Sequence, residues 1–128
     1  MDPKSLRFAP THEWVSLQDD VATVGISKFA VDQLSDLTMI ELKEVGTRLA
    51  TGKTFGEVES VKSVSDLYAP LDGEVLEVNN EVVGNVQLLS DDPYGAGWLI
   101  KLRVSDPSAV SALMDHDAYE KRVAEEPD

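Results

Sequence analysis

The sequence predicts a mainly β fold with peripheral helices. Short runs rich in β-branched and aromatic residues alternate with clusters of turn residues along most of the 128-residue chain. Two of these runs, residues 21–26 and 98–104, have the period-two alternation of half-buried strands. Many short strands separated by turns indicate a mainly antiparallel arrangement.

The first third of the chain predicts three extended segments and one short helix. Extended segments are expected at 11–15 and 21–26, with a turn at Asp19–Asp20 between them. Ser27 is a good N-cap for a helix over 28–34. The run 37–42 has apolar residues that do not alternate cleanly, which favours a strand covered on both sides.

Residues 56–70 contain two β-branched runs that meet at one lysine. Val58, Val61 and Val64 favour extended backbone, so a hairpin is expected with Lys62 at or near its tip. The tip has no Asn-Gly or Asp-Gly pair, and a type I turn fits instead. From these residues alone, Lys62 is a solvated lysine on a turn.

The rest of the chain predicts two more strands and a helical C-terminal extension. The expected elements are strand 73–78, a helical turn at 79–84, a turn region at 91–97, strand 98–104 and a helical extension at about 106–128. A helix starts at Asp106 with a proline in its first turn. A last helix is expected to start at Asp115 or Asp117, and the acidic tail after Ala124 is expected to fray.

Composition limits the classes of function. A formal net charge of −13 argues against nucleic acid and anionic membranes as partners and favours a partner with a basic surface. The absence of cysteine excludes a disulfide framework, a thiolate nucleophile and a zinc cluster, so sulfur chemistry would need an attached group.

Length and hydropathy bound the domain count and the location. The chain is expected to form one domain, 1–128. No apolar run approaches the ~18 residues of a membrane span, and residues 1–10 lack the apolar core of a signal peptide. A bacterial cytoplasmic protein is expected, and a mature mitochondrial form is the alternative.

No catalytic or metal site is recognisable in the sequence. His12 and His116 lie far apart without metal-ligand spacing, and a packing or hydrogen-bonding role is expected for His12. His12 and Glu13 are adjacent on a presumed strand, so their side chains should face opposite ways and cannot form a dyad. The serines beside Lys62 lie in no nucleophile elbow, and the glycines form no phosphate-binding motif. The chain is therefore not expected to be an autonomous enzyme.

Several segments together form a specific signal that none of them carries alone. They are His-Glu-Trp within 11–15, Val-Gly-Ile at 24–26, Glu-Ser-Val-Lys within 56–70, Gly-Glu-Val at 73–75, and Asp-Pro-Tyr-Gly-x-Gly-Trp within 92–100. In content and order they resemble the landmarks of the glycine cleavage system H proteins. The resemblance covers roughly residues 8–104, and the C-terminal helices fit it too.

The resemblance implies a lipoyl-domain-like barrel-sandwich hybrid of two antiparallel sheets, with lipoic acid joined by an amide to Lys62. It implies a non-catalytic carrier that moves the aminomethyl group of glycine from a PLP-dependent glycine decarboxylase to an aminomethyltransferase. Dihydrolipoamide dehydrogenase would reoxidise the dithiol. A lysine amine is almost fully protonated at neutral pH, so a lipoyl or octanoyl transferase or a lipoate ligase is expected to attach the group. A monomer is expected.

The resemblance also implies where a loaded arm lies. In the family, a glutamate of the His-Glu-Trp segment meets the amine of the arm, and this position is Glu13 here; the alternative is an ordinary strand-edge acid. Glu59, Ser60 and Asp66, close to the lysine, are the other candidates for arm parking or recognition.

The chain departs from the family pattern at four positions. Gln33 stands where histidine is frequent, Ser35 where glycine is frequent, Val86 where proline is common and Ser90 where asparagine is common. A glutamine forms hydrogen bonds but does not titrate, so arm parking or the choice of partner can differ. The alternative that the chain is an H-like protein, which relays lipoyl groups to other enzymes, therefore stays open.

Three further kinds of protein are alternatives to an H protein. A biotin carrier usually has its lysine between methionines, and Val61 and Ser63 argue against it. A lipoyl domain of a 2-oxo acid dehydrogenase would lack the His-Glu-Trp and Asp-Pro-Tyr-Gly-x-Gly-Trp segments. An unmodified acidic interaction module, in which Lys62 is merely a hairpin lysine, also stays open.

Overall fold

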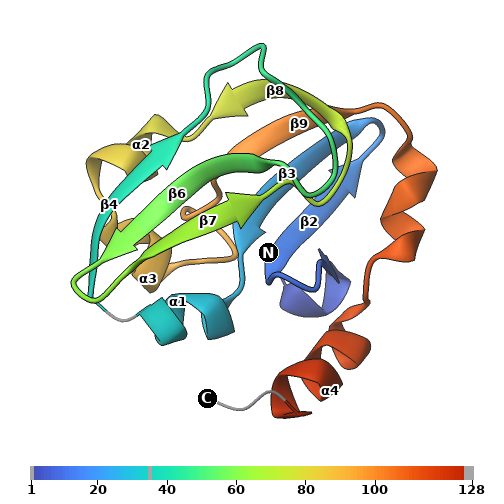
Figure 1. Ribbon diagram of the computed structural model, residues 1–128. Helices are drawn as coiled ribbons and strands as arrows, with labels where there is room; N and C mark the ends of the chain where they lie inside the picture. The colour runs from blue at the N-terminus through green and yellow to red at the C-terminus, as the bar shows by residue number, and fades with distance from the viewer. Residues whose placement is uncertain (1, 35, 126–128) are drawn as a thin grey trace.

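Two antiparallel sheets, flanked by short helices, make up the fold (Figure 1). The computed structural model describes residues 2–34 and 36–125. The larger sheet has six strands in the order β1-β2-β3-β9-β8-β5, and the smaller has three in the order β4-β6-β7. The expected mainly β fold of two antiparallel sheets is confirmed.

The elements follow one another closely along the chain. The strands are β1 (Arg7–Phe8), β2 (Glu13–Gln18), β3 (Val21–Ile26), β4 (Leu37–Leu42), β5 (Arg48–Leu49), β6 (Thr54–Ser60), β7 (Val64–Tyr68), β8 (Gly73–Val78) and β9 (Ile100–Val104). The α-helices are α1 (Lys28–Leu34), α2 (Asn80–Gly84), α3 (Gln87–Asp91) and α4 (His116–Glu125), and the 3-10 helices are η1 (Pro3–Ser5) and η2 (Pro107–Ala112).

The main core lies between the two sheets, with the smaller sheet in front of the larger one in Figure 1. Val24 and Leu102 of the larger sheet are fully buried in one cluster with Phe55 and Val58 of the smaller sheet. Burial of each such side chain contributes roughly 1.5–3 kcal/mol. The alternation in the sequence therefore reports the inward faces of β3 and β9 correctly.

A second apolar cluster fastens the C-terminal helix to the first strands. Phe8 and Trp14 are fully buried there together with Tyr119 of α4. The rings of Phe8 and Tyr119 are stacked with their centroids 4.3 Å apart. Phe8 also exchanges two backbone hydrogen bonds with Met114, of 2.8 and 3.0 Å. Helix α4 is thus held beside β1 and β2.

Two local predictions were wrong, and a third was right only in part. The strand expected at 98–104 begins only at Ile100, because the Asn79 side chain binds the carbonyl oxygens of Ala96 and Trp98 at 2.9 and 2.7 Å. The helix expected after Asp106 is present with Asp106 as its cap and a proline in its first turn, but it is a 3-10 helix that ends at Ala112. The strand 37–42 is not covered on both sides, since β4 is an edge strand and Met39 is 39% exposed.

Helix α3 was not predicted at all. No element was predicted between the helical turn at 79–84 and the turn region at 91–97. The helix expected at 79–84 is present as α2, capped by the Asn79 side chain. Two short helices thus connect β8 to the loop that precedes β9.

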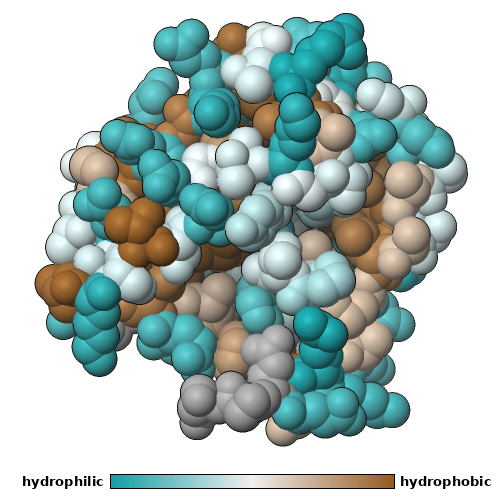
Figure 2. All heavy atoms as spheres, viewed as in Figure 1, coloured by the Kyte–Doolittle hydropathy of each residue, from teal (hydrophilic) through white to brown (hydrophobic). Residues whose placement is uncertain are grey.

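The outward face of the smaller sheet carries a row of acids. Glu57 pairs with Glu41 on one side and with Asp66 on the other, and all three are exposed. Like charges directly opposite on neighbouring strands repel each other. Toward the hairpin tip, where apolar side chains show on the surface in Figure 2, Met39 and Val64 are exposed.

Candidate functional site

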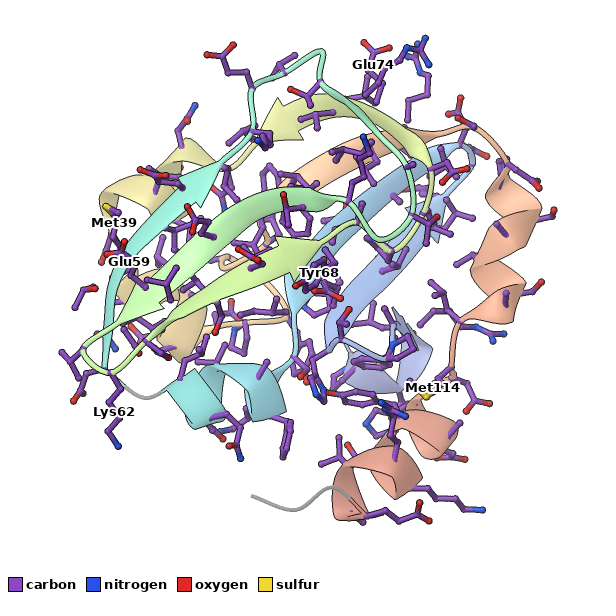
Figure 3. The ribbon with its side chains drawn as sticks, in the orientation of Figure 1. Met39, Glu59, Lys62, Tyr68, Glu74 and Met114 are labelled. Carbon is purple, nitrogen blue, oxygen red and sulfur yellow. The ribbon has the colours of Figure 1, made fainter. Side chains whose placement is uncertain are left out.

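Strands β6 and β7 form a hairpin, and Lys62 lies in the connection between them (Figure 3). Glu59 pairs with Val64, so residues 60–63 make the tip. Lys62 is exposed, and its side chain points away from the sheet in Figure 3. The amine is therefore open to another protein.

The backbone of the tip is held by hydrogen bonds on both sides of Lys62. The Ser60 amide donates to the Ser63 carbonyl at 2.8 Å. The Ser60 hydroxyl accepts from the amides of Lys62 and Ser63 at 3.3 and 3.2 Å. The Val61 amide donates to the carbonyl of Asp36 at 3.0 Å, which ties the tip to the start of β4. The flexible side chain of Lys62 thus extends from a backbone whose conformation is held by hydrogen bonds.

A groove of about 500 Å³ runs between helix α1, strand β7 and the segment that leads into β2. Its polar lining comes from all three: Thr11, His12 and Glu13, then Gln33 of α1 and Asp66 of β7. Most of the remaining lining is apolar. Strand β7 leads from the hairpin tip into this groove.

Glu13 is the buried acid of the groove. Its side chain is 1% exposed. The Thr11 hydroxyl donates to Oε1, and the Tyr68 amide donates to Oε2 at 3.1 Å. Burial raises the pKa of Glu13 above its ordinary value, and these hydrogen bonds only partly oppose the rise. The alternative of an ordinary strand-edge acid is wrong.

The prediction that His12 and Glu13 lie together on a strand is wrong. Its φ is +82°, which is uncommon outside glycine, and β2 begins only at the next residue. Because of this left-handed turn, His12 and Glu13 both line the groove instead of facing opposite ways. The His12 Nδ1 lies 2.7 Å from the Tyr119 hydroxyl, so the expected hydrogen-bonding role is confirmed.

The other candidate residues separate into two groups. Asp66 lines the groove with Glu13, although the two lie on different sheets. Ser60 shapes the hairpin tip, and Glu59 lies on the smaller sheet between Met39 and Val64. Thr11 was not predicted as a site residue, although its hydroxyl donates to Glu13; its position two residues before Glu13 is the one signal for it in the sequence.

Residues 2–34 and 36–125 contain neither a candidate metal cluster nor a helix that could span a membrane. No group of three or more histidine, aspartate or glutamate side chains there could hold a metal ion. Within the same part of the chain, no helix has both the length and the apolar composition needed to cross a membrane.

Comparison with known proteins identifies the family. The model of the family described as glycine cleavage H-protein matches residues 6–126. The chain belongs to the glycine cleavage H-protein family. The glycine cleavage system H protein of Synechococcus sp. (strain JA-2-3B'a(2-13)) is 50% identical over 117 residues, which cover 91% of each chain. That of Acaryochloris marina (strain MBIC 11017) is 48% identical over 121 residues, 94% of each.

A solved H protein has the same fold. The crystal structure of a glycine cleavage system H protein from Mycobacterium marinum superimposes with a TM-score of 0.89 at 36% sequence identity. The match covers 95% of this chain and 98% of that one. The fold expected for an H protein therefore extends over nearly the whole chain.

The departures from the H-protein pattern fall in different places. Gln33 lines the groove, so it can contact whatever binds there. Ser90 lies on α3, and Val86 occupies the N-cap position of that helix without a capping side-chain hydrogen bond. Ser35 lies outside the described residues.

Proposed function

We propose that the chain is the lipoyl carrier of a glycine cleavage system, with lipoic acid joined by an amide to Lys62. The single observation that carries the proposal is the exposed Lys62 on a fixed hairpin tip, in a chain of the H-protein family. Residues 1–128 act as one non-catalytic carrier domain. Joined to Lys62, the group would supply a disulfide, so that one sulfur could carry the aminomethyl unit while the other becomes a thiol; a dithiol would remain only after the unit has been passed on.

The groove fits such a group. Asp66 lies four residues beyond Lys62, about 13 Å along an extended strand. A lysine side chain with a lipoyl chain has about a dozen bonds of roughly 1.5 Å, so it reaches about 14 Å when extended. The mainly apolar lining suits a hydrocarbon arm, and the groove volume of about 500 Å³ leaves room for it.

Glu13 is proposed to bind the amine of a loaded arm. A buried carboxylate is costly without a cation beside it, so an ammonium group is its natural partner. Thr11 and the Tyr68 amide orient the carboxylate through their hydrogen bonds. Asp66, at the groove edge, adds negative charge. The apolar walls exclude water from the amine and so slow its loss.

Glu59 and Ser60 are proposed to serve recognition of the hairpin. Ser60 fixes the backbone conformation that presents Lys62. Glu59 faces outward near the tip, where an enzyme that modifies Lys62 would meet it (Figure 3). The attaching enzyme is a lipoyl or octanoyl transferase or a lipoate ligase.

The proposed partners follow from the glycine cleavage system. They are the PLP-dependent glycine decarboxylase, the aminomethyltransferase and dihydrolipoamide dehydrogenase, and the carrier visits them as a monomer. A cytoplasmic location stays a prediction. A second candidate function is the relay of lipoyl groups to other enzymes. Gln33 favours this function, because the groove is lined there by a glutamine where H proteins frequently have a histidine.

Intact mass and peptide mapping of the protein from cells competent for lipoylation test the proposal. A lipoyl group on Lys62 is expected, and Lys62→Arg protein should carry none. Bare Lys62 would contradict the carrier function, and a biotinyl group would identify a different carrier. The lipoylated protein should then support glycine–CO2 exchange with a cognate decarboxylase. Lipoylation without exchange would favour the relay function.

A further inference from the structure

One phenol oxygen connects the C-terminal helix to both sides of the groove. Tyr119 of α4 is 2% exposed. Its hydroxyl lies 2.7 Å from Nδ1 of His12 and 2.6 Å from Oγ of Ser27. Ser27 Oγ in turn accepts from the Ala30 amide at 3.2 Å, as the N-cap of α1. The chain of hydrogen bonds joins three segments that are far apart in sequence.

The residues at the two ends of this series of hydrogen bonds, His12 and Ala30, line the groove. His12 lines it on the side of β2, and Ala30 lines it on the side of α1. The rings of His12 and Phe29 lie across from each other with their centroids 5.1 Å apart. The position of the His12 ring therefore affects how wide the groove is at this point.

The backbone alone does not fix that ring. The Ser27 amide donates to the His12 carbonyl at 2.9 Å, and this bond holds the two segments together whatever residue 119 is. The contact between the Tyr119 hydroxyl and Nδ1 of His12, in contrast, holds the imidazole ring, and this ring faces Phe29. Loss of the Tyr119 hydroxyl is therefore expected to shift the His12 ring and weaken the cap of α1, without separating the two segments.

We propose that Tyr119 is a positioning residue for the groove in which the lipoyl arm is proposed to lie. Through its hydroxyl, helix α4 holds the His12 ring against Phe29 and secures the N-terminus of α1. The groove then stays narrow enough to retain a loaded arm beside Glu13. The part of this proposal that concerns the arm rests on the proposed function; the part that concerns the His12 ring does not.

Tyr119→Phe is the decisive variant, because it keeps the ring that stacks on Phe8 and removes only the hydroxyl. Tyr94→Phe is the matched control. The Tyr94 hydroxyl accepts from the Lys28 amide at 3.0 Å, so it too binds α1, but at a residue outside the groove lining. Both variants lose a hydroxyl contact with the N-terminal end of α1, so a change at the His12 ring in Tyr119→Phe alone is specific to the Tyr119 hydroxyl.

The first readout uses the unmodified carrier and is independent of lipoylation. In NMR spectra of Tyr119→Phe, the signals of the His12 ring nitrogens should shift, because Nδ1 loses the hydroxyl beside it. The NOE between the His12 and Phe29 rings should weaken, and the Ala30 amide should exchange faster. Tyr94→Phe should leave the His12 ring signals unchanged. An unaltered His12–Phe29 contact in Tyr119→Phe would overturn the proposal.

The second readout is the rate at which the loaded carrier loses its aminomethyl group. Loss of one hydrogen bond should raise this rate about five-fold in Tyr119→Phe. His12→Ala should raise it as much, and the double variant should lose the group no faster than His12→Ala alone, because Tyr119 acts through His12. Additive effects, or a wild-type rate in Tyr119→Phe with a displaced ring, would refute the role in arm retention. A carrier that is never lipoylated would contradict the proposed function while the NMR result still decides the positioning.

Discussion

Replacing Glu13 by glutamine removes the buried charge of the groove and keeps the shape of the side chain. The amide oxygen can accept from the Tyr68 amide, and the NH2 group can donate to the Thr11 hydroxyl oxygen, so both present partners are retained. Stability at neutral pH should therefore stay within about 1 kcal/mol of the wild type or rise. Glu13→Ala leaves both partners unsatisfied and should cost about 2 kcal/mol, which lowers Tm by roughly 6–10 °C.

The pH dependence of stability gives an independent check on Glu13. Burial raises the pKa of Glu13 in the folded protein above its ordinary value of 4.5, so the folded state disfavours the ionised form. The contribution of Glu13 to the free energy of unfolding is therefore largest at acidic pH and is lost as the pH rises through the raised pKa. Glu13→Gln has no such titration. Its stability relative to the wild type should increase from about pH 4.5 upward, as measured by urea denaturation across pH.

Both variants should lose the aminomethyl group faster than the wild type. A charge-assisted hydrogen bond contributes about 1.5–3 kcal/mol, so the loss should accelerate by roughly 10- to 100-fold. The assay loads the lipoylated carrier with glycine and decarboxylase, isolates it and follows its intact mass with time. A wild-type lifetime in Glu13→Gln would refute the amine-binding role. A Glu13→Gln variant as unstable as Glu13→Ala would refute the hydrogen-bond pattern.

Three other substitutions test the frame around the site. Gly56→Ala should cost about 3 kcal/mol in urea denaturation, because its Cβ would clash with a carbonyl oxygen of β4; a near-neutral result would mean that the two strands can move apart. Ser60→Ala should raise amide exchange at Ser63 several-fold and cost less than about 1 kcal/mol overall, and unchanged exchange would contradict the hydroxyl's role at the tip. Asn79→Ala should cost about 3 kcal/mol, because it removes the α2 cap and the bonds to the Ala96 and Trp98 carbonyls. Asn79→Asp keeps the cap but sets a carboxylate oxygen against both carbonyls, so it should also be destabilised; wild-type stability in Asn79→Asp would contradict the role of these two bonds.

Sequence patterns predicted the inward faces of the strands well. Val24 and Leu102 belong to period-two runs, and the period reports which face is buried. The same reasoning failed for Met39, because an apolar residue does not reveal whether another layer covers it. It also misplaced the start of β9, which depends on a hydrogen bond from a side chain 19 residues earlier.

The candidate site was predictable only in part. Three valines predicted a hairpin around Lys62, but the function of the lysine needed the family resemblance. The groove could not be predicted from the sequence, since Glu13 and Asp66 come from different sheets. The turn at His12 was hidden as well, because its positive φ occurs without the glycine that usually signals it.

The acid row on the smaller sheet gives salt two opposite effects on the carrier. Glu57 lies between Glu41 and Asp66, so dissolved ions that screen their repulsion should stabilise the fold. The same screening weakens attraction between this face and a basic partner. The concentration of salt that best preserves the isolated carrier is therefore not the one at which it associates fastest.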